Sequence, residues 1–157
     1  MKKLIPILTL LLLLTSCGSM KVYVNNDSTY SRKNPITIVA PQDESGTMGE
    51  LQFLLQSNGY KLLSYSAAKK AINLDTEYGD NTTHKELTNT TSFNSAYVLE
   101  LNYNYHWDLR YVYTTFSATI TDLRSSEIIM TANFRGDKGC RAVLEELVEK
   151  MNAVIKK

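Results

Sequence analysis

The chain has 157 residues, with 17 Lys and Arg against 16 Asp and Glu, so its formal net charge is +1. This near balance gives no indication of a nucleic-acid partner, which would need a basic stripe. The two histidines, His84 and His106, fall in different predicted elements, whereas a zinc site needs three or four nitrogen or sulfur ligands. We therefore predict no nucleic-acid partner, no metal and no cofactor.

The first residues have the pattern of a secretory signal. Lys2 and Lys3 form a short basic region, and the run from Leu4 to Leu14 is almost wholly apolar. A membrane-spanning helix needs about 20 apolar residues, so this run is too short to cross a bilayer. A basic start, a short apolar core and small residues after it are typical of a signal peptide. We predict that residues 1–16 are this signal peptide.

The signal ends on one of only two cysteines in the chain. Leu14-Thr15-Ser16-Cys17, followed by Gly18, resembles the bacterial lipobox. In such lipoproteins the cysteine sulfur is acylated with diacylglycerol and the chain is cut just before that cysteine. The resemblance implies lipidation at Cys17 and a membrane anchor. Because Gly18 rather than Asp follows the cysteine, it favours an outer-membrane lipoprotein with a periplasmic domain.

Residues 17–34 follow as a polar segment rich in Ser, Asn and Lys, which we interpret as the lipidated cysteine and a linker, with Lys21–Val24 as a possible short strand. Residues 35–157 are then one domain of typical size. The β-branched run between Pro35 and Pro41 predicts its first strand. A helical stripe of Met48, Leu51, Leu54 and Leu55 follows, ended by Asn58-Gly59.

The next segments alternate between apolar and polar stretches. Residues 60–65 predict a second strand, residues 66–74 a short helix, and the polar residues 75–94 a long surface loop. Apolar residues then alternate with polar ones from 97 to 107 and again from 112 to 121, which predicts two long strands with one buried face.

Turn residues at 122–127 separate these strands from a third, which covers 128–134. The glycines of 136–139 predict its end. Apolar residues spaced by three and four positions then predict a final amphipathic helix from Cys140 to Ile155, with Cys140 on its buried side. The predicted class is α+β, in the order β-α-β-(α)-β-β-β-α, with a mixed sheet and helices packed on one face.

This order carries a family resemblance. The segments "LQFLLQSNGYKLLSYSAAKKAI", "SAYVLELNYNY" and "FSATITDLRSSEIIMTANFRG" are similar to parts of a small α/β domain. That domain is shared by the curli-secretion-channel lipoproteins, the lipoprotein activators of penicillin-binding proteins and the amino-terminal domain of the Tol-system periplasmic propeller protein. The resemblance covers most of residues 35–157 and implies a docking or assembly module rather than an enzyme.

Five aromatic residues gather around one tight connection. They are Tyr103, Tyr105 and Trp107 before it, and Tyr111 and Tyr113 after it. Tyr and Trp are enriched at protein interfaces because their rings bury a large area while their polar tips stay hydrated. We interpret the five rings as a partner-binding surface; the alternative is that they cap the core beneath a helix or the long loop.

No nucleophile, acid or base in the sequence is paired at a recognisable catalytic spacing, so we predict no catalytic residue and no enzyme. The favoured hypothesis is a membrane-anchored envelope lipoprotein that binds another envelope protein or self-associates. The alternative is an envelope ligand-binding protein or enzyme that uses the loop at 75–94.

Overall fold

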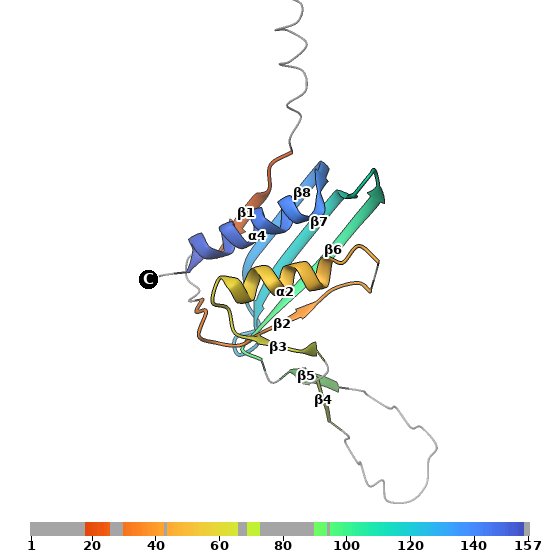
Figure 1. Cartoon of the computed structure of the whole chain (residues 1–157). Helices are drawn as coiled ribbons and strands as arrows, with labels where there is room; N and C mark the ends of the chain where they lie inside the picture. The colour runs from red at the N-terminus through yellow and green to blue at the C-terminus, as the bar shows by residue number, and fades with distance from the viewer. Residues whose placement is uncertain are drawn as a thin grey trace, which may run out of the picture.

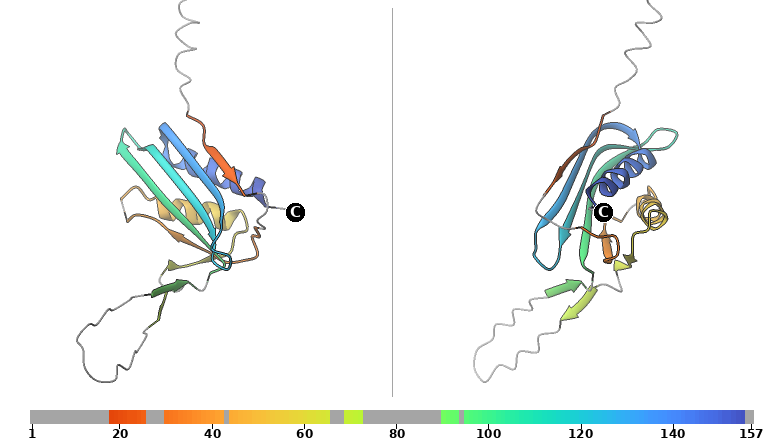
Figure 2. Two further views of the ribbon diagram at one scale, coloured as in Figure 1. Left: turned by 180° about the vertical axis from the view of Figure 1, so that it is seen from behind. Right: turned by 90° about the vertical axis from the view of Figure 1, so that its left-hand side faces the viewer.

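The computed structural model describes residues 18–25, 30–42, 44–65, 69–72, 90–93 and 95–155. Two helices lie on the same side of a mixed sheet, and the long strands run diagonally across them (Figures 1 and 2). The elements in chain order are β1 (Lys21–Val24), β2 (Ile36–Val39), α2 (Thr47–Ser57), β3 (Leu62–Leu63), β4 (Lys69–Ile72), β5 (Thr90–Phe93), β6 (Tyr97–Trp107), β7 (Tyr111–Asp122), β8 (Ile128–Gly139) and α4 (Cys140–Val154). The predicted α+β class is confirmed.

The main sheet has six strands in the order β1-β8-β7-β6-β2-β3. Strands β6, β7 and β8 form an antiparallel meander, β2 lies parallel to β6, and β3 lies parallel to β2. The parallel step from β2 to β3 is made through α2, as a crossover connection requires. Strand β1 closes the other side of the sheet, antiparallel to β8.

The meander forms because its strands alternate apolar and polar side chains. Along β6, Tyr97, Leu99, Leu101 and Tyr103 are buried, whereas Glu100 and Asn102 between them are exposed. Period-two alternation places each set on one face, so the sheet has one apolar face and one polar face. The core under the helices is formed by the apolar face and by the buried stripes of α2 and α4, which include Leu51, Leu55, Val143, Leu144, Leu147 and Met151.

Two predicted local structures are wrong. Residues Lys69–Ile72 were expected in a short helix but form β4, which pairs antiparallel with β5, and β5 lies in the segment expected to be a loop. The other residues of the predicted 75–94 loop, 75–89 and 94, lie outside the described residues. Pairing between distant segments has decided the structure here against local propensity.

The glycines of 136–139 also fail to end the third strand of the meander. Strand β8 continues through Gly139 and leads directly into α4 at Cys140. Its partner β7 shifts register between Tyr113 and Thr115, and this irregularity accommodates the extra residue in β8.

The domain begins upstream of the predicted boundary at residue 35. Strand β1 is part of the main sheet, and the side chains of Met20 and Tyr30 are buried in the core. Arg32 lies over the ring of Tyr60, at 5.6 Å from its centroid, and donates a hydrogen bond of 3.0 Å to Asn152 of α4. Residues assigned to a linker therefore belong in part to the folded domain.

In the part of the chain that the structure describes, no helix is long and apolar enough to span a membrane.

Candidate functional site

The β6–β7 hairpin ends in an exposed apolar tip. Asp108, Leu109 and Arg110 make the connection, which is closed by a hydrogen bond of 2.8 Å from the Asp108 amide to the Arg110 carbonyl. Leu109 has φ 55° and a side chain that is 94% exposed. The left-handed region disfavours a large side chain, and turns usually place Gly, Asn or Asp there. The hairpin thus holds a leucine in solvent at a position where a polar or small residue would fold more easily.

The five predicted interface rings become more exposed toward the tip of the hairpin. Tyr103 and Tyr113 are buried in the core, Tyr105 and Tyr111 are half-buried, and Trp107 is 66% exposed. The apolar face of β6 starts in the core and runs past the covering helices into solvent (Figure 1). A partner could touch the outer three rings but not the inner two, so a partner-binding role stays a prediction for Tyr105, Trp107 and Tyr111.

The rings form a continuous series from the core to the tip. Tyr113 packs against Tyr103 with centroids 5.2 Å apart, and Tyr103 lies 6.3 Å from Tyr105. Tyr105 meets Tyr111 edge to face at 5.4 Å, and Tyr111 meets Trp107 in the same way at 5.0 Å. Edge-to-face pairs are each worth about 0.5–1.5 kcal/mol beyond their buried area. The exposed end of the hairpin is therefore connected to the core by ring contacts that hold it in place.

The inner end of this series is fixed by a buried hydroxyl network. The Tyr113 hydroxyl is hydrogen-bonded to Thr47 in the first turn of α2, and Thr47 also contacts Ser45. Burial raises the pKa of Tyr113 well above its ordinary value, and the Thr47 hydrogen bond offsets part of this rise. Gly46 precedes α2, and no side chain caps the start of this helix. Thr47 instead joins α2 to β7.

Cys140 lies beside Tyr113 at the start of α4 and is 8% exposed. Its predicted place on the buried side of the last helix is confirmed. A buried thiol in apolar surroundings is inert toward reagents that attack the thiolate.

We expect Cys140 of the lipidated protein to resist iodoacetamide in the folded state and to react after denaturation. Cys140→Ala should lower the free energy of unfolding by about 1 kcal/mol or more, because it leaves a small cavity. Mass spectrometry of the alkylated chain and urea denaturation measure the two effects. Rapid alkylation of the native protein with unchanged stability would contradict the buried position.

The first described residue, Gly18, is packed tightly against the second half of β8. A Cβ atom on Gly18 would lie 2.5 Å from the carbonyl oxygen of Arg135 and 3.0 Å from the Phe134 ring, and real Cβ atoms do not approach backbone so closely. Gly136 faces Gly18 from β8. Glycine is required at position 18 by this close approach of two backbones.

The segment after Gly18 is held by α4. The Met20 amide donates a 2.9 Å hydrogen bond to Glu146, which also forms a 2.6 Å ion pair with Lys138 of β8. Partial burial raises the pKa of Glu146, but the bonds from Lys138 and Met20 together outweigh it and hold that pKa below its usual value. The carboxylate therefore stays charged at neutral pH and joins the residue before β1 to β8 and α4.

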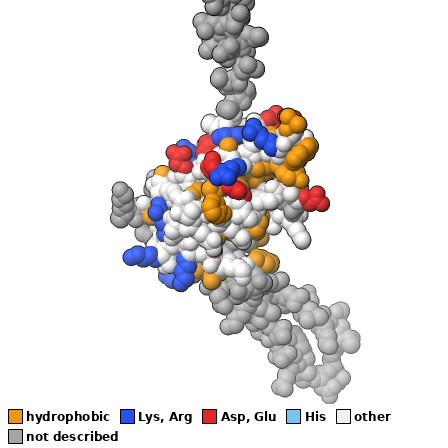
Figure 3. Space-filling model, in the orientation of Figure 1, with side chains coloured by type: hydrophobic (Ala, Val, Ile, Leu, Met, Phe, Trp, Pro, Cys, Tyr) orange, Lys and Arg blue, Asp and Glu red, His pale blue; other side chains and the backbone are white. Residues whose placement is uncertain are grey.

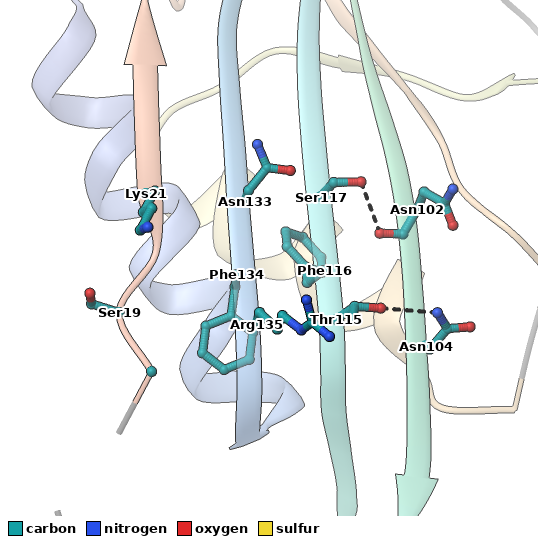
Figure 4. Close-up of a pocket in the computed structure, with 11 residues that line it drawn as sticks. Ser19, Lys21, Asn102, Asn104, Thr115, Phe116, Ser117, Asn133, Phe134 and Arg135 are labelled. Atoms are coloured by element: carbon teal, nitrogen blue, oxygen red, sulfur yellow. Dashed lines mark hydrogen bonds between the residues drawn. The ribbon is translucent and has the colours of Figure 1, made fainter. Parts of the chain in front are cut away.

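The polar face of the sheet forms a shallow open hollow of about 630 Å³ beside the same segment (Figure 4). Asn104 donates to Thr115, and Ser117 donates to the Asn102 carbonyl, so these polar groups bond along the sheet. Lys21 and Arg135 are its charged residues, with no acid among the lining residues. Within the described residues no three His, Cys, Asp or Glu side chains are grouped to hold a metal ion. None of the residues that line the hollow is a His, Cys, Asp or Glu.

The structural roles of Gly18 and Leu109 were not predicted from the sequence. Gly18 was noted only as the residue after the lipobox, and Leu109 only as part of a tight connection. The close packing of Gly18 follows from the pairing of β1 with β8, which is a long-range contact. The apolar Leu109 between Asp108 and Arg110 was the one local signal that could have marked the tip.

Comparison with known proteins supports the fold. No family model matches the chain, and no curated protein is similar to it in sequence. The structure is similar to PelC from Paraburkholderia phytofirmans, solved as a dodecamer, with a TM-score of 0.51 and 13% identity over 89% of this chain and 100% of that chain. A point variant of that PelC dodecamer gives a TM-score of 0.50 and 10% identity over 89% of this chain and 99% of that chain. A minor lipoprotein from Acinetobacter baumannii gives a TM-score of 0.34 and 14% identity over 78% of this chain and 90% of that chain.

Proposed function

We propose that this chain is a lipid-anchored protein of the bacterial envelope, whose domain acts as a protein-interaction or assembly module. The sequence contributes the signal peptide and the lipobox at Cys17. The observation that carries the proposal is the packing of Gly18 against Arg135, because the domain then starts one residue after the lipidated cysteine. A lipid on Cys17 would hold the domain directly at the membrane, with the outer membrane as the favoured location.

Self-association is the form of assembly that we favour. PelC, which shares this fold, is a dodecamer in its crystal structures. In this chain, β1 and the two-residue β3 are the edges of the main sheet within the described residues. Open edges carry unpaired backbone groups that can pair with another chain. A ring or chain of copies on the membrane would therefore be a scaffold for other envelope proteins.

We expect the mature protein to form a defined multimer in detergent, and a Cys17→Ala form produced without residues 1–16 to keep the same multimer without lipid. Light scattering coupled to size exclusion measures both masses, and crosslinking in intact cells checks that the multimer exists there. A monomer at every concentration for both forms would contradict self-association. In that case, crosslinking to a different envelope protein would be the remaining support for an interaction module.

A further inference from the structure

The anchor and the aromatic tip lie at the same end of the domain. Strand β1 runs antiparallel to β8, so going back from Lys21 to Gly18 the chain moves toward the end where β6 stops and β7 begins. Figure 1 shows the chain entering β1 at the end of the sheet that carries the β6–β7 hairpin. Figure 3 shows hydrophobic side chains gathered at this end of the molecule.

We propose that the hairpin tip, formed by Tyr105, Trp107, Leu109 and Tyr111, inserts into the surface of the bilayer that holds the Cys17 lipid. The proposal rests on the lipid anchor of the proposed function and names a second, protein-borne contact with the same membrane. The tip would fix the tilt of the domain, which a lipid chain alone leaves open.

The distances along the strands fit this placement. Gly18 is level with Arg135, which pairs with Thr115 of β7. Tyr111 lies four residues before Thr115, toward the tip, which is about 13 Å at 3.3 Å per residue. Consecutive Cα atoms are about 3.8 Å apart, so a lipid on Cys17 begins close to this level. The headgroup region on each side of a bilayer is roughly 5–8 Å thick. Even with strands tilted by about 45°, the tip would pass the anchor by about 9 Å and reach the base of the headgroups.

The chemistry of the tip matches the membrane interface. Trp and Tyr concentrate at the level of the headgroups because their rings are apolar and their polar atoms can stay hydrated. Trp107 and Leu109 supply exposed apolar area, and the half-buried Tyr105 and Tyr111 brace them from below. The left-handed backbone of Leu109 is a strained conformation, and such strain is concentrated at functional positions.

The charges near the tip favour a lipid surface over a charged protein. Asp108 and Arg110 balance each other in the connection, and the Arg110 guanidinium lies back against Gly139 at the end of β8. Near them on β8, Asp137 is exposed, and Lys138 is paired with Glu146. With no excess of one sign, insertion should depend little on anionic lipid or salt.

Trp107 is the single tryptophan of the chain, so its fluorescence reports on the tip alone. The lipidated wild-type protein is placed in vesicles of phosphatidylethanolamine and phosphatidylglycerol, and a Cys17→Ala form produced without residues 1–16 is measured in buffer. We expect vesicles to shift the Trp107 emission to the blue and to protect it several-fold from iodide. Phospholipids brominated near the headgroup should quench it.

A second reporter provides the matched control. Ile128 is 52% exposed at the turn between β7 and β8, at the opposite end of the sheet. A Trp107→Phe, Ile128→Trp protein should keep an aqueous emission and full iodide quenching in the same vesicles.

The outcomes separate the two proposals. Wild-type protein that floats with vesicles while Trp107 remains as accessible to iodide as in buffer would overturn tip insertion and leave the anchor intact. Protection of Trp107 that rises with protein concentration and needs no vesicles would overturn it in favour of a second copy of the chain at the tip. Wild-type protein that carries no lipid would overturn the proposed function itself. Insertion of the tip with blue-shifted, bromine-quenched emission supports the inference.

Discussion

Replacing Cys17 by Ala should abolish palmitate labelling of the protein and leave the uncleaved precursor in the cell. Acylation and cleavage both require the cysteine of the lipobox, so the effect should be complete rather than partial. Two or three acyl chains provide stable anchoring because each buried methylene contributes about 0.8 kcal/mol. Radiolabelled palmitate, followed by gel analysis and membrane fractionation, measures the incorporation, the precursor size and the location.

Cys140→Ala is the matched control, because it removes the other cysteine and leaves the lipobox unchanged. It should be labelled like the wild type. Equal labelling of the wild type and the Cys17→Ala protein would exclude lipidation at Cys17. It would also contradict the proposal that this lipid holds the domain at the membrane.

Replacing Leu144 by Ala should destabilise the domain by about 2–5 kcal/mol. Leu144 is fully buried on the side of α4 that faces the sheet, and the truncated side chain leaves a cavity between these layers. A loss of this size is a large share of the roughly 5–15 kcal/mol that holds an ordinary domain folded. Urea denaturation of the lipid-free Cys17→Ala form produced without residues 1–16, followed by circular dichroism, measures it.

Leu109→Ala makes the same chemical change at a position that is 94% exposed. It should alter the free energy of unfolding by less than about 0.5 kcal/mol, because no buried contact is lost. Similar costs at Leu144 and Leu109 would mean that α4 does not pack on the sheet as described. The comparison of the two variants also tests whether the hairpin tip belongs to the core. A binding residue at the surface should have a small effect on the free energy of unfolding, as we expect for Leu109.

Much of the fold could be predicted because the pattern of β6, β7 and α4 is local. The alternation around Leu99 and Leu101 and the helical spacing around Leu144 each require one buried face, whatever the partner of that face. The short elements could not be predicted in this way. Residues 69–72 form a strand through pairing with β5, and no local pattern states which distant segment will pair with it.

The aromatic cluster shows the same division within one hairpin. The alternation predicted that Tyr103, Tyr105 and Trp107 share a face, and they do. Which of them lies in the core depends on how far α2 and α4 extend along the sheet, because a strand is buried only where another layer covers it. Tyr103 is covered and Trp107 is not.

By itself, the sequence predicted the signal peptide and the lipobox at Cys17, and it determined the long strands and the buried face of the final helix. These follow from short motifs and from the periods of strands and helices, which are properties of neighbouring residues. Only the tertiary structure decided that Gly18 packs against the domain, and that Gly18 and the exposed tip lie toward the same end of the sheet. Both depend on β1 pairing with β8 across more than one hundred residues of chain, a contact fixed by burial of the whole core rather than by any local pattern.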